Sequence, residues 1–450
     1  MATSATESRG NWNSKVGFVL AAAGSAVGLG NIWKFPTEAA SNGGAVFLII
    51  YIICIFVIGF PVMMAELTIG RNTQKNPVGA FRALSNNVLY PLIGVWGVIC
   101  GIVILSFYTV VAGWAFGYVF EEIFFYLNMP GLAAFFGDFE HGIKNALFSI
   151  LFMTATISII TGGVSNGIEK ATKTMMPVLI GIILIMIGYV VTQEGSMKGL
   201  SAYLQPDFSN VSTSIVLNAV GQAFFSLSLG MGAMITYGSY LRKNQNIAES
   251  ALYVTITDTG IAFLAGLLIM PTMFVAQANG VQIFTDDGSL VASSALVFQV
   301  LPELFHQLGG VLGLVIGVMF FLLLSIAALT SSISLLEVPT SYAIDEFGIA
   351  RKKAAMGIGI GILAISLLIS FDISLIGTLD LVFNKVGLPL GGMLTALFVG
   401  FVWKTDNALA EIEHGFPGVQ QHFISRVWPV FIRYICPLLI LVNLLSDLLF

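Results

Sequence analysis

Residues 24–36 read GSAVGLGNIWKFP, and they interrupt an apolar segment that is long enough to cross a membrane. Gly24, Gly28 and Gly30 fall within seven residues, and each glycine costs about 1 kcal/mol relative to alanine inside a helix. This composition predicts that the backbone unwinds there. Unwound backbone in the middle of a bilayer is tolerated only where protein or a water-filled cavity satisfies its N–H and C=O groups. The stretch therefore predicts a binding site inside the membrane.

The composition of the whole chain indicates an integral membrane protein. Hydrophobic residues make up 57% of the 450 positions and charged residues only 10%, whereas soluble domains carry about 25% charged residues. Apolar runs of about 20 residues, the length that spans a bilayer, recur along the chain. We predict eleven transmembrane segments, at residues 14–40, 44–70, 88–126, 145–161, 168–191, 213–241, 247–276, 310–346, 355–371, 374–403 and 426–448.

The positive charges show how these segments are oriented. Lysine and arginine gather before the first segment and then in every second connection, while the other connections are poor in cations. Cation-rich connections face the cytoplasm in membrane proteins. We therefore expect a multi-pass protein of the plasma membrane, which is the inner membrane in a bacterium. Its N-terminus would be cytoplasmic and, after eleven crossings, its C-terminus would lie outside.

A second interruption, FSLSLGMG at residues 225–232, falls in the sixth segment, five after the first. One glycine-rich stretch would be explained by close helix packing, but two at matching positions are typical of the midplane site of a transporter with inverted repeats. The predicted fold is all-α, with one transporter domain over residues 1–450 and broken first and sixth helices. Segments 1–5 form a first inverted repeat over residues 12–191, segments 6–10 form a second over 213–403, and residues 426–448 add a C-terminal helix.

Longer motifs around these interruptions resemble the neurotransmitter:sodium symporter family. Residues 24–36 resemble its first-helix signature, and the similarity continues through residues 42–45 to Glu66 and Arg71. Residues 221–232 resemble the broken sixth helix, and residues 329–337 resemble the eighth helix of the bacterial amino-acid transporters. The resemblance implies sodium-coupled import of an amino acid by alternating access, and no enzymatic activity.

A zwitterionic amino acid needs N–H donors for its carboxylate and oxygen acceptors for its ammonium group. A half-helix that begins near Leu29 offers free N–H groups and the positive end of its dipole. Tyr108 alone would be explained by packing at an interface, but the resemblance implies that its hydroxyl donates to the substrate carboxylate. The substrate-binding residues implied are Ser25, Ala26, Gly28, Leu29, Gly30, Ile104, Tyr108, Phe225, Ser226, Ser228, Met231, Ser331 and Leu335.

The side chains expected to select the substrate are mostly apolar. Met231 stands where the family often has an aromatic residue, and methionine adapts its shape and contacts aromatic rings favourably. We therefore expect a neutral hydrophobic L-amino acid, aromatic ones included, while small amino acids remain an alternative.

The family resemblance also implies two sodium sites, and sodium, as a hard cation, prefers oxygen ligands. The first site would use Ala26, Asn31 through its amide oxygen, Ser226, Asp258 and the substrate carboxylate. The second would use carbonyl groups of Gly24, Val27 and Ala327 with hydroxyl groups of Thr330 and Ser331. A carboxylate inside a membrane segment, such as Asp258, marks a functional site by default, whereas Thr330 alone would be explained by a bond within its own helix.

Chloride is not expected to be required. Chloride-dependent relatives place a hydroxyl one turn after the position of Asp258, and some chloride-independent ones place a carboxylate there. This chain has Ala262 and matches neither pattern, so the expectation rests on the negative charge of Asp258 itself.

The resemblance finally implies gates on both sides of the site. Lys34 and Asp380 would form the outer pair, although the usual residue at the first position is arginine, whose planar fork binds a carboxylate more firmly. Arg9, Trp12 and Asp345 would form the cytoplasmic latch. In the fifth segment, Gly167 and Pro177 fit either an ordinary kink or an inner end that unwinds to admit water.

The alternative functions are a channel, a sensor and an intramembrane enzyme. A channel also uses broken helices, and a sensor could share the transporter fold. The four histidines are scattered, H-E-x-x-H is absent, and so is the phosphate-binding G-x-x-x-x-G-K-[ST] of ATP-driven pumps. The expected partners are an amino acid, sodium ions and membrane lipid, with no nucleic acid, and the sequence leaves the oligomeric state open.

Overall fold

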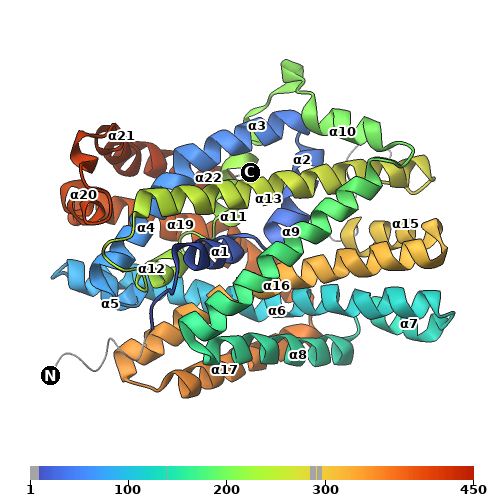
Figure 1. Ribbon diagram of the computed structural model, residues 1–450, viewed down its shortest axis with the longest axis horizontal. Helices are drawn as coiled ribbons and strands as arrows, with labels where there is room; N and C mark the ends of the chain where they lie inside the picture. The colour runs from blue at the N-terminus through green and yellow to red at the C-terminus, as the bar shows by residue number, and fades with distance from the viewer. Residues whose placement is uncertain (1–9, 139, 284–289, 291–295, 450) are drawn as a thin grey trace.

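The chain folds into long helices that lie side by side (Figure 1). The computed structural model describes residues 10–138, 140–283, 290 and 296–449. The first half forms α1 (Lys15–Ala26), α2 (Phe35–Ser41), α3 (Ala45–Cys54), α4 (Phe60–Thr73), α5 (Pro77–Leu84), α6 (Pro91–Tyr126), α7 (Pro130–Gly137), α8 (Gly142–Thr161), α9 (Lys170–Val190) and α10 (Ser196–Leu204). The second half forms α11 (Thr213–Ser226), α12 (Ala233–Gly238), α13 (Ile247–Ala278), α15 (Leu301–Leu308), α16 (Gly310–Phe347), α17 (Arg351–Phe371), α18 (Ser374–Leu379), α19 (Leu388–Leu397), α20 (Thr405–Glu413), α21 (Ile424–Val430) and α22 (Cys436–Leu449).

Short π-helical and 3₁₀-helical turns extend these helices. The π-helical turns are η1 (Gly30–Lys34), η2 (Ile55–Gly59), η3 (Val164–Glu169), η5 (Leu296–Val300), η6 (Asp380–Gly387), η7 (Phe398–Val402) and η9 (Phe431–Ile435). The 3₁₀ turns are η4 (Phe208–Asn210) and η8 (Val419–Gln421).

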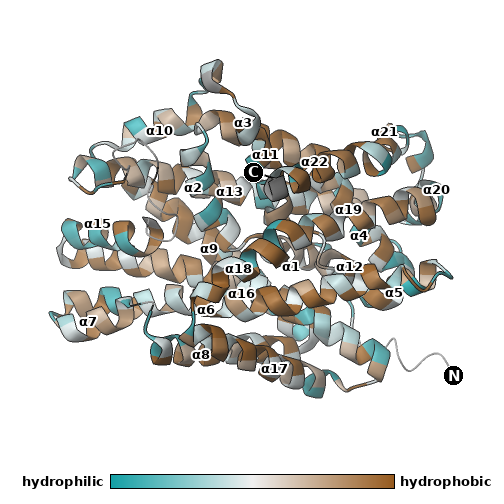
Figure 2. Cartoon of the chain, turned by 180° about the vertical axis from the view of Figure 1, so that it is seen from behind, coloured by the Kyte–Doolittle hydropathy of each residue, from teal (hydrophilic) through white to brown (hydrophobic). Residues whose placement is uncertain are grey.

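The helices have the length and composition of membrane spans. Within the described ranges, nine helices or helix runs are long and apolar enough to cross a membrane, and the bent pair Lys15–Ala26 and Gly30–Ser41 makes a tenth. Hydrophobic residues cover the lengths of the helices, and hydrophilic ones gather mostly toward the two ends of the bundle (Figure 2). The all-helical fold with many apolar spans is therefore confirmed.

Both predicted interruptions are present. Helix α1 ends at Ala26, Val27 is extended (φ −75°, ψ 102°), and the chain resumes as η1 and α2 at an angle of 58°. Helix α11 ends at Ser226 and α12 begins only at Ala233. The predicted total of eleven crossings requires α11 and α12 to form one more span across this second break. That total and the two inverted repeats stay predictions.

The two halves of the first broken helix share α13 as a neighbour, and each half has further neighbours of its own. At the start of α1, the backbone N–H of Asn13 and the hydroxyl of Ser14 donate to the carboxylate of Glu169 in η3, at 2.7 and 2.9 Å. Beyond the break, Phe35 of α2 packs its ring against Tyr51 of α3, with centroids 4.6 Å apart. The break therefore separates two pieces that both pack on α13 but make their other contacts with different elements.

A buried ion pair joins α4 to α20. Arg71 Nε donates to Glu411 Oε1 at 2.8 Å, and Lys243 Nζ lies 2.8 Å from Glu411 Oε2. Burial alone would raise the pKa of Glu411, but hydrogen bonds from Lys243 and Asn72 and the charge of Arg71 lower that pKa below its usual value. Glu411 is therefore ionised at neutral pH, and it neutralises the fully buried Arg71.

The second break depends on backbone conformations and spacings that only glycine provides. Gly230 has a φ of +82°, and its N–H donates to the carboxylate of Glu66 in α4 at 2.7 Å. A Cβ atom at Gly230 would lie 2.0 Å from the carbonyl oxygen of Leu388 in α19. Any side chain here would push α19 away from the break.

We expect Gly230→Ala to destabilise the protein. Overpacking of this kind costs about 1–3 kcal/mol, and the positive φ adds strain, so the melting temperature of the purified protein in detergent should fall. Gly260→Ala is the matched control, because nothing lies within 4 Å of a Cβ atom there, and its melting temperature should be unchanged or slightly higher. Equal melting temperatures for the two variants would contradict this account of the break.

Candidate functional site

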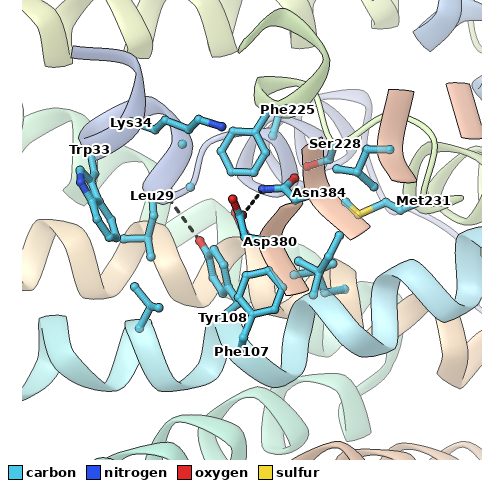
Figure 3. A pocket seen from close by; sticks show the side chains of 18 of the residues that line it. Leu29, Trp33, Lys34, Phe107, Tyr108, Phe225, Ser228, Met231, Asp380 and Asn384 are labelled. Carbon is cyan, nitrogen blue, oxygen red and sulfur yellow. Dashed lines mark hydrogen bonds between the residues drawn. The ribbon is translucent and has the colours of Figure 1, made fainter. Parts of the chain in front are cut away.

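A cavity of about 330 Å³ lies beside both helix breaks (Figure 3). Its walls come from the α1–η1 break, from α6, from residues 225–231, from α16 and from residues 376–388. Every predicted substrate-binding residue except Ser226 lines it. Residues more than 300 positions apart in the sequence thus meet at the place where the spanning helices are interrupted.

Polar groups of the cavity meet at the unwound part of the first helix. The N–H of Leu29 donates to the hydroxyl oxygen of Tyr108 at 3.2 Å. The hydroxyls of Ser228 and Ser331 both donate to the carbonyl oxygen of Ser25, at 2.8 and 3.2 Å. A Cβ atom at Gly28 would lie 2.4 Å from Ser331 Oγ and 2.8 Å from the Tyr108 hydroxyl, so only glycine leaves this backbone accessible to them.

The remaining wall is largely apolar, and part of it was not predicted. The residues missed are Trp33, Glu38, Phe107, Val111, Ile376, Gly377, Asn384 and Leu388. Phe107 and Val111 lie three residues beyond Ile104 and Tyr108 on α6, so helical spacing could have found them. Asn384 lies one turn after Asp380 and donates to its carboxylate at 2.7 Å.

Aromatic rings and charges surround one part of the cavity. The ammonium group of Lys34 lies over the ring of Phe225, 4.5 Å from its centroid. Trp33 packs edge-to-face on Phe298 of η5, with ring centroids 5.4 Å apart. Lys34 and Asp380 line the same cavity, and their pairing as an outer gate stays a prediction.

A buried polar cluster joins the first break to α13. Asn31 Nδ2 donates to Asp258 Oδ1 at 2.7 Å and to Ser226 Oγ at 3.1 Å. Ser226 Oγ donates to Asp258 Oδ2 at 2.8 Å, and the hydroxyl of Tyr51 donates to Ser226 Oγ at 3.0 Å. Asp258 is fully buried, and an ionised buried carboxylate is stable only when paired.

Asn31 presents its amide nitrogen to this cluster, because the carboxylate of Asp258 attracts a donor. The role of its amide oxygen as a sodium ligand stays a prediction. The amide oxygen instead accepts from the N–H of Gly28 at 3.4 Å. A half-turn of the carboxamide would present its oxygen to a cation beside Asp258.

A second cluster of oxygens joins the same break to α16. Thr330 Oγ1 donates to the carbonyl oxygens of Val27 and Ala327, at 3.2 and 2.9 Å. Ser331 Oγ also donates to the carbonyl of Val27, at 3.3 Å. A Cβ atom at Gly24 would lie 3.4 Å from Thr330 Cβ, so Gly24 adjoins the group. Thr330 makes both the bond within its own helix and the bond to the broken helix.

The predicted cytoplasmic latch is described in part. Trp12 is buried, and its Nε1 donates to the carbonyl oxygen of Tyr237 at 3.0 Å. Asp345 accepts hydrogen bonds from the backbone and side-chain nitrogens of Asn76, at 2.7 and 3.1 Å. Arg9 lies outside the described residues.

The fifth segment is helical from Val164 to Val190. Gly167 lies in η3, where a Cβ atom would come 2.0 Å from the carbonyl oxygen of Ile159. Pro177 lies inside α9. The glycine therefore permits a close backbone approach, and the unwinding of this end stays a prediction.

An apolar helix bundle whose broken helices enclose a cavity and buried oxygen clusters has the architecture of a secondary transporter. A sequence model of the sodium:neurotransmitter symporter family matches residues 9–131 and 122–448. The chain belongs to this family, and it is a sodium-dependent transporter with a multi-pass membrane fold.

Individual proteins agree with this assignment. A sodium-dependent transporter of Bacillus subtilis is 33% identical over 450 residues, which cover 97% of each chain. Another, of Haemophilus influenzae, is 30% identical and covers 99% of this chain and 100% of its own. The crystal structure of MhsT in complex with L-phenylalanine is 38% identical, has a TM-score of 0.83, and covers 98% of this chain and 100% of that one.

Because the family is sodium-dependent, the oxygen cluster at Thr330 can be tested with sodium alone. An ion that binds only the folded protein raises its melting temperature. We expect Thr330→Val to shift the sodium concentration for half-maximal stabilisation at least tenfold upward, which corresponds to about 1.4 kcal/mol. The measurement is thermal melting in detergent with sodium replaced stepwise by potassium.

Ser332→Ala is the matched control for Thr330→Val. Its hydroxyl is also buried on α16 but donates only within the helix, to the carbonyl of Ala328 at 2.7 Å. This variant should keep the sodium response of the unmodified protein. A Thr330→Val protein with an unchanged sodium response would remove Thr330 from the ion site.

Proposed function

We propose that the protein is a symporter that uses the sodium gradient to import a neutral hydrophobic L-amino acid, aromatic ones included. The observation that carries the proposal is the cavity at the two broken helices, with an apolar wall and an oxygen cluster on either side of the first break. The complex of MhsT with L-phenylalanine supports the substrate class, since that chain shares 38% of its sequence with this one.

The two ends of the substrate would bind at the break. The carboxylate would accept hydrogen bonds from the N–H groups of the half-helix that begins at Leu29 and Gly30, where the helix dipole favours an anion. The hydroxyl of Tyr108 would turn its proton to the same carboxylate. The ammonium group would donate hydrogen bonds to carbonyl oxygens at the ends of α1 and α11, near Ala26 and Phe225.

The side chain of the substrate would lie against the apolar wall. Ile104, Phe107 and Val111 present one face of α6 to the cavity, and Met231 and Leu335 lie on the same wall. An acidic or basic side chain placed among these apolar groups would lose hydration, because none of these five residues carries a charge. This wall therefore favours neutral hydrophobic substrates.

Two sodium ions would accompany each substrate. The first would lie among Ala26, Asn31, Ser226 and Asp258 and touch the substrate carboxylate, which links ion and substrate directly. The second would lie among Gly24, Val27, Ala327, Thr330 and Ser331. Chloride would not be required, because Asp258 itself supplies the negative charge and Ala262 offers no hydroxyl.

Alternating access would use eleven crossings arranged as two inverted repeats, with the N-terminus in the cytoplasm and the C-terminus outside. Lys34 and Asp380 would close the outer side, and Arg9 and Asp345, with Trp12 packed beside them, would close the inner side. Such pairs suit a gate, because an exposed ion pair is worth only about 0–1 kcal/mol. Unwinding between Gly167 and Pro177 would then admit water to the second sodium.

The experiment that tests this function is sodium-dependent binding of a panel of radiolabelled amino acids to the purified protein. We expect saturable binding of L-phenylalanine and L-leucine in sodium but not in potassium, and no binding of L-glutamate or L-lysine. In proteoliposomes, an inward sodium gradient should drive uptake of the amino acids that bind. Binding without uptake would instead indicate a sensor, and ion flux without saturable binding would indicate a channel.

The role of Asp258 gives a sharper prediction. We expect Asp258→Ala to reduce sodium-driven uptake to the level of empty liposomes, because the first ion loses its only charged ligand from the protein. Asp406→Ala, which removes an exposed carboxylate from the first turn of α20, should transport normally. Both proteins should elute as single peaks in size-exclusion chromatography. Undiminished uptake by a folded Asp258→Ala protein would refute the first-site assignment.

A further inference from the structure

Three side chains that could hold a metal ion meet at the end of α6, away from the cavity. They are Glu121 and Glu122 of α6 and His306 of α15, and one ligand atom from each lies within 4.8 Å of the others. Helix α15 lies beside the start of α16 at the same end of the bundle as α7 (Figure 1). The group therefore connects a long spanning helix to the short helix that follows η5.

Two of the three spacings between these ligand atoms match tetrahedral coordination. His306 Nε2 lies 3.4 Å from Glu121 Oε1 and 3.5 Å from Glu122 Oε2. Zinc binds nitrogen and oxygen ligands at about 2.0–2.2 Å, so two ligand atoms of a tetrahedral site stand about 3.3–3.6 Å apart. An ion between the three side chains would find two of the three ligand pairs already at this distance.

The carboxylates lack the hydrogen bonds that buried charges need. Glu122 is fully buried, and neither of its oxygens accepts a hydrogen bond. The nearby hydroxyls of Tyr118 and Tyr126 donate instead to the carbonyl oxygens of Phe298 and Phe305, both at 2.5 Å. Within the described residues, His306 is the only cationic partner of these two carboxylates. Two buried carboxylates with so little compensation are costly unless a cation joins them.

The surroundings fix the positions of Glu122 and His306. The ring of His306 stacks on Phe125, with centroids 3.5 Å apart and planes 6° apart, which sets the direction of Nε2. A Cβ atom at Gly317 of α16 would lie 2.5 Å from the carboxylate of Glu122, so a glycine makes room for this group. The side chain of His306 is 19% exposed, which leaves a route for an ion from solvent.

We propose that Glu121, Glu122 and His306 form a binding site for a divalent transition-metal ion of the zinc type. An imidazole ligand favours zinc and its neighbours over sodium, calcium or magnesium, which prefer oxygen alone. Three protein ligands leave a fourth position for water, as in other open zinc sites. The site is separate from the sodium clusters, because its residues lie on α6 and α15.

A bound ion would restrain η5, which packs beside the cavity wall, and this part of the proposal rests on the proposed transport function. Helix α15 follows η5, where Phe298 packs on Trp33 of the cavity wall and on Trp114 of α6. Joining α15 to α6 through a metal would hold η5 in this position. Bound zinc should therefore slow any step that lifts η5 from the cavity.

The test is zinc titration of the purified, tag-free full chain by isothermal titration calorimetry in a buffer that does not bind metals. We expect one site per chain, and at least tenfold weaker binding for both His306→Gln and Glu122→Gln. His414→Gln is the matched control, since His414 lies near a single carboxylate, 4.0 Å from Glu411, and it should bind zinc like the unmodified protein. Monodisperse elution and an unchanged melting temperature without zinc would show that each variant is folded.

The experiments test the metal site, the restraint on η5 and the transport function separately. No zinc binding by the unmodified chain, or equal binding by a folded His306→Gln protein, would overturn the site. In proteoliposomes, zinc outside should slow uptake at least twofold in the unmodified protein and not in His306→Gln. Uptake insensitive to zinc despite binding would overturn the restraint on η5. The absence of uptake without zinc would refute the proposed transport function and leave the metal site standing.

Discussion

The structure depends on satisfying the peptide groups that the first spanning helix gives up at Val27. An apolar bilayer offers these groups no water, and each unsatisfied one would cost several kcal/mol. The partners come from other helices: hydroxyls of Thr330 and Ser331 on α16 for the carbonyl of Val27, and Ser228 for the carbonyl of Ser25. The break is thus stable only inside a bundle that supplies hydroxyl and amide groups at this depth.

The same requirement bears on the proposed second sodium site. A hydroxyl that donates to a carbonyl can turn away and present its oxygen to a cation, so Thr330 would serve the empty and the loaded state of that proposed site with little movement of the backbone. Gln222 donates to the carbonyl of Gly30 at 3.1 Å, and Glu66 accepts from Gly230 at 2.7 Å. These two side chains hold backbone groups beside the breaks, and the proposed exchange of partners would take place between them. A site that binds and releases an ion needs fixed surroundings and central hydrogen bonds that the ion can replace.

Much of this arrangement could be predicted from the sequence, because the signals are local. Gly24, Gly28 and Gly30 mark the first break and Gly230 and Gly232 mark the second, and family motifs placed Tyr108, Asp258 and Thr330 in their register. The direction of the Asn31 carboxamide could not be predicted, because it depends on the competition between Asp258 and Gly28 for its two ends. Asn384 was missed although it lies one turn after the predicted Asp380, because only the folded chain shows that its amide donates to the carboxylate of Asp380.

The cluster of carboxylates and histidine at the end of α6 was even harder to predict from the sequence. Glu121 and Glu122 are followed by His306 only after more than 180 residues, so no spacing rule connects them. Their burial is also hidden in the sequence, where a pair of glutamates near the end of a spanning helix reads as a solvated terminus. The packing of Phe125 on His306 and the glycine at position 317 become meaningful only in three dimensions.

The bend of 58° at the first break has a mechanical consequence. No regular helical ladder crosses Val27, so twisting one half-helix transmits little torque to the other. The half that begins near Lys15 is also bound to Glu169 of η3, and the half that ends at Ser41 also packs on α3, while both halves contact α13. In the proposed transport cycle, the two half-helices would tilt separately along α13, which both of them contact, so that one end of the cavity would open while the other stays closed.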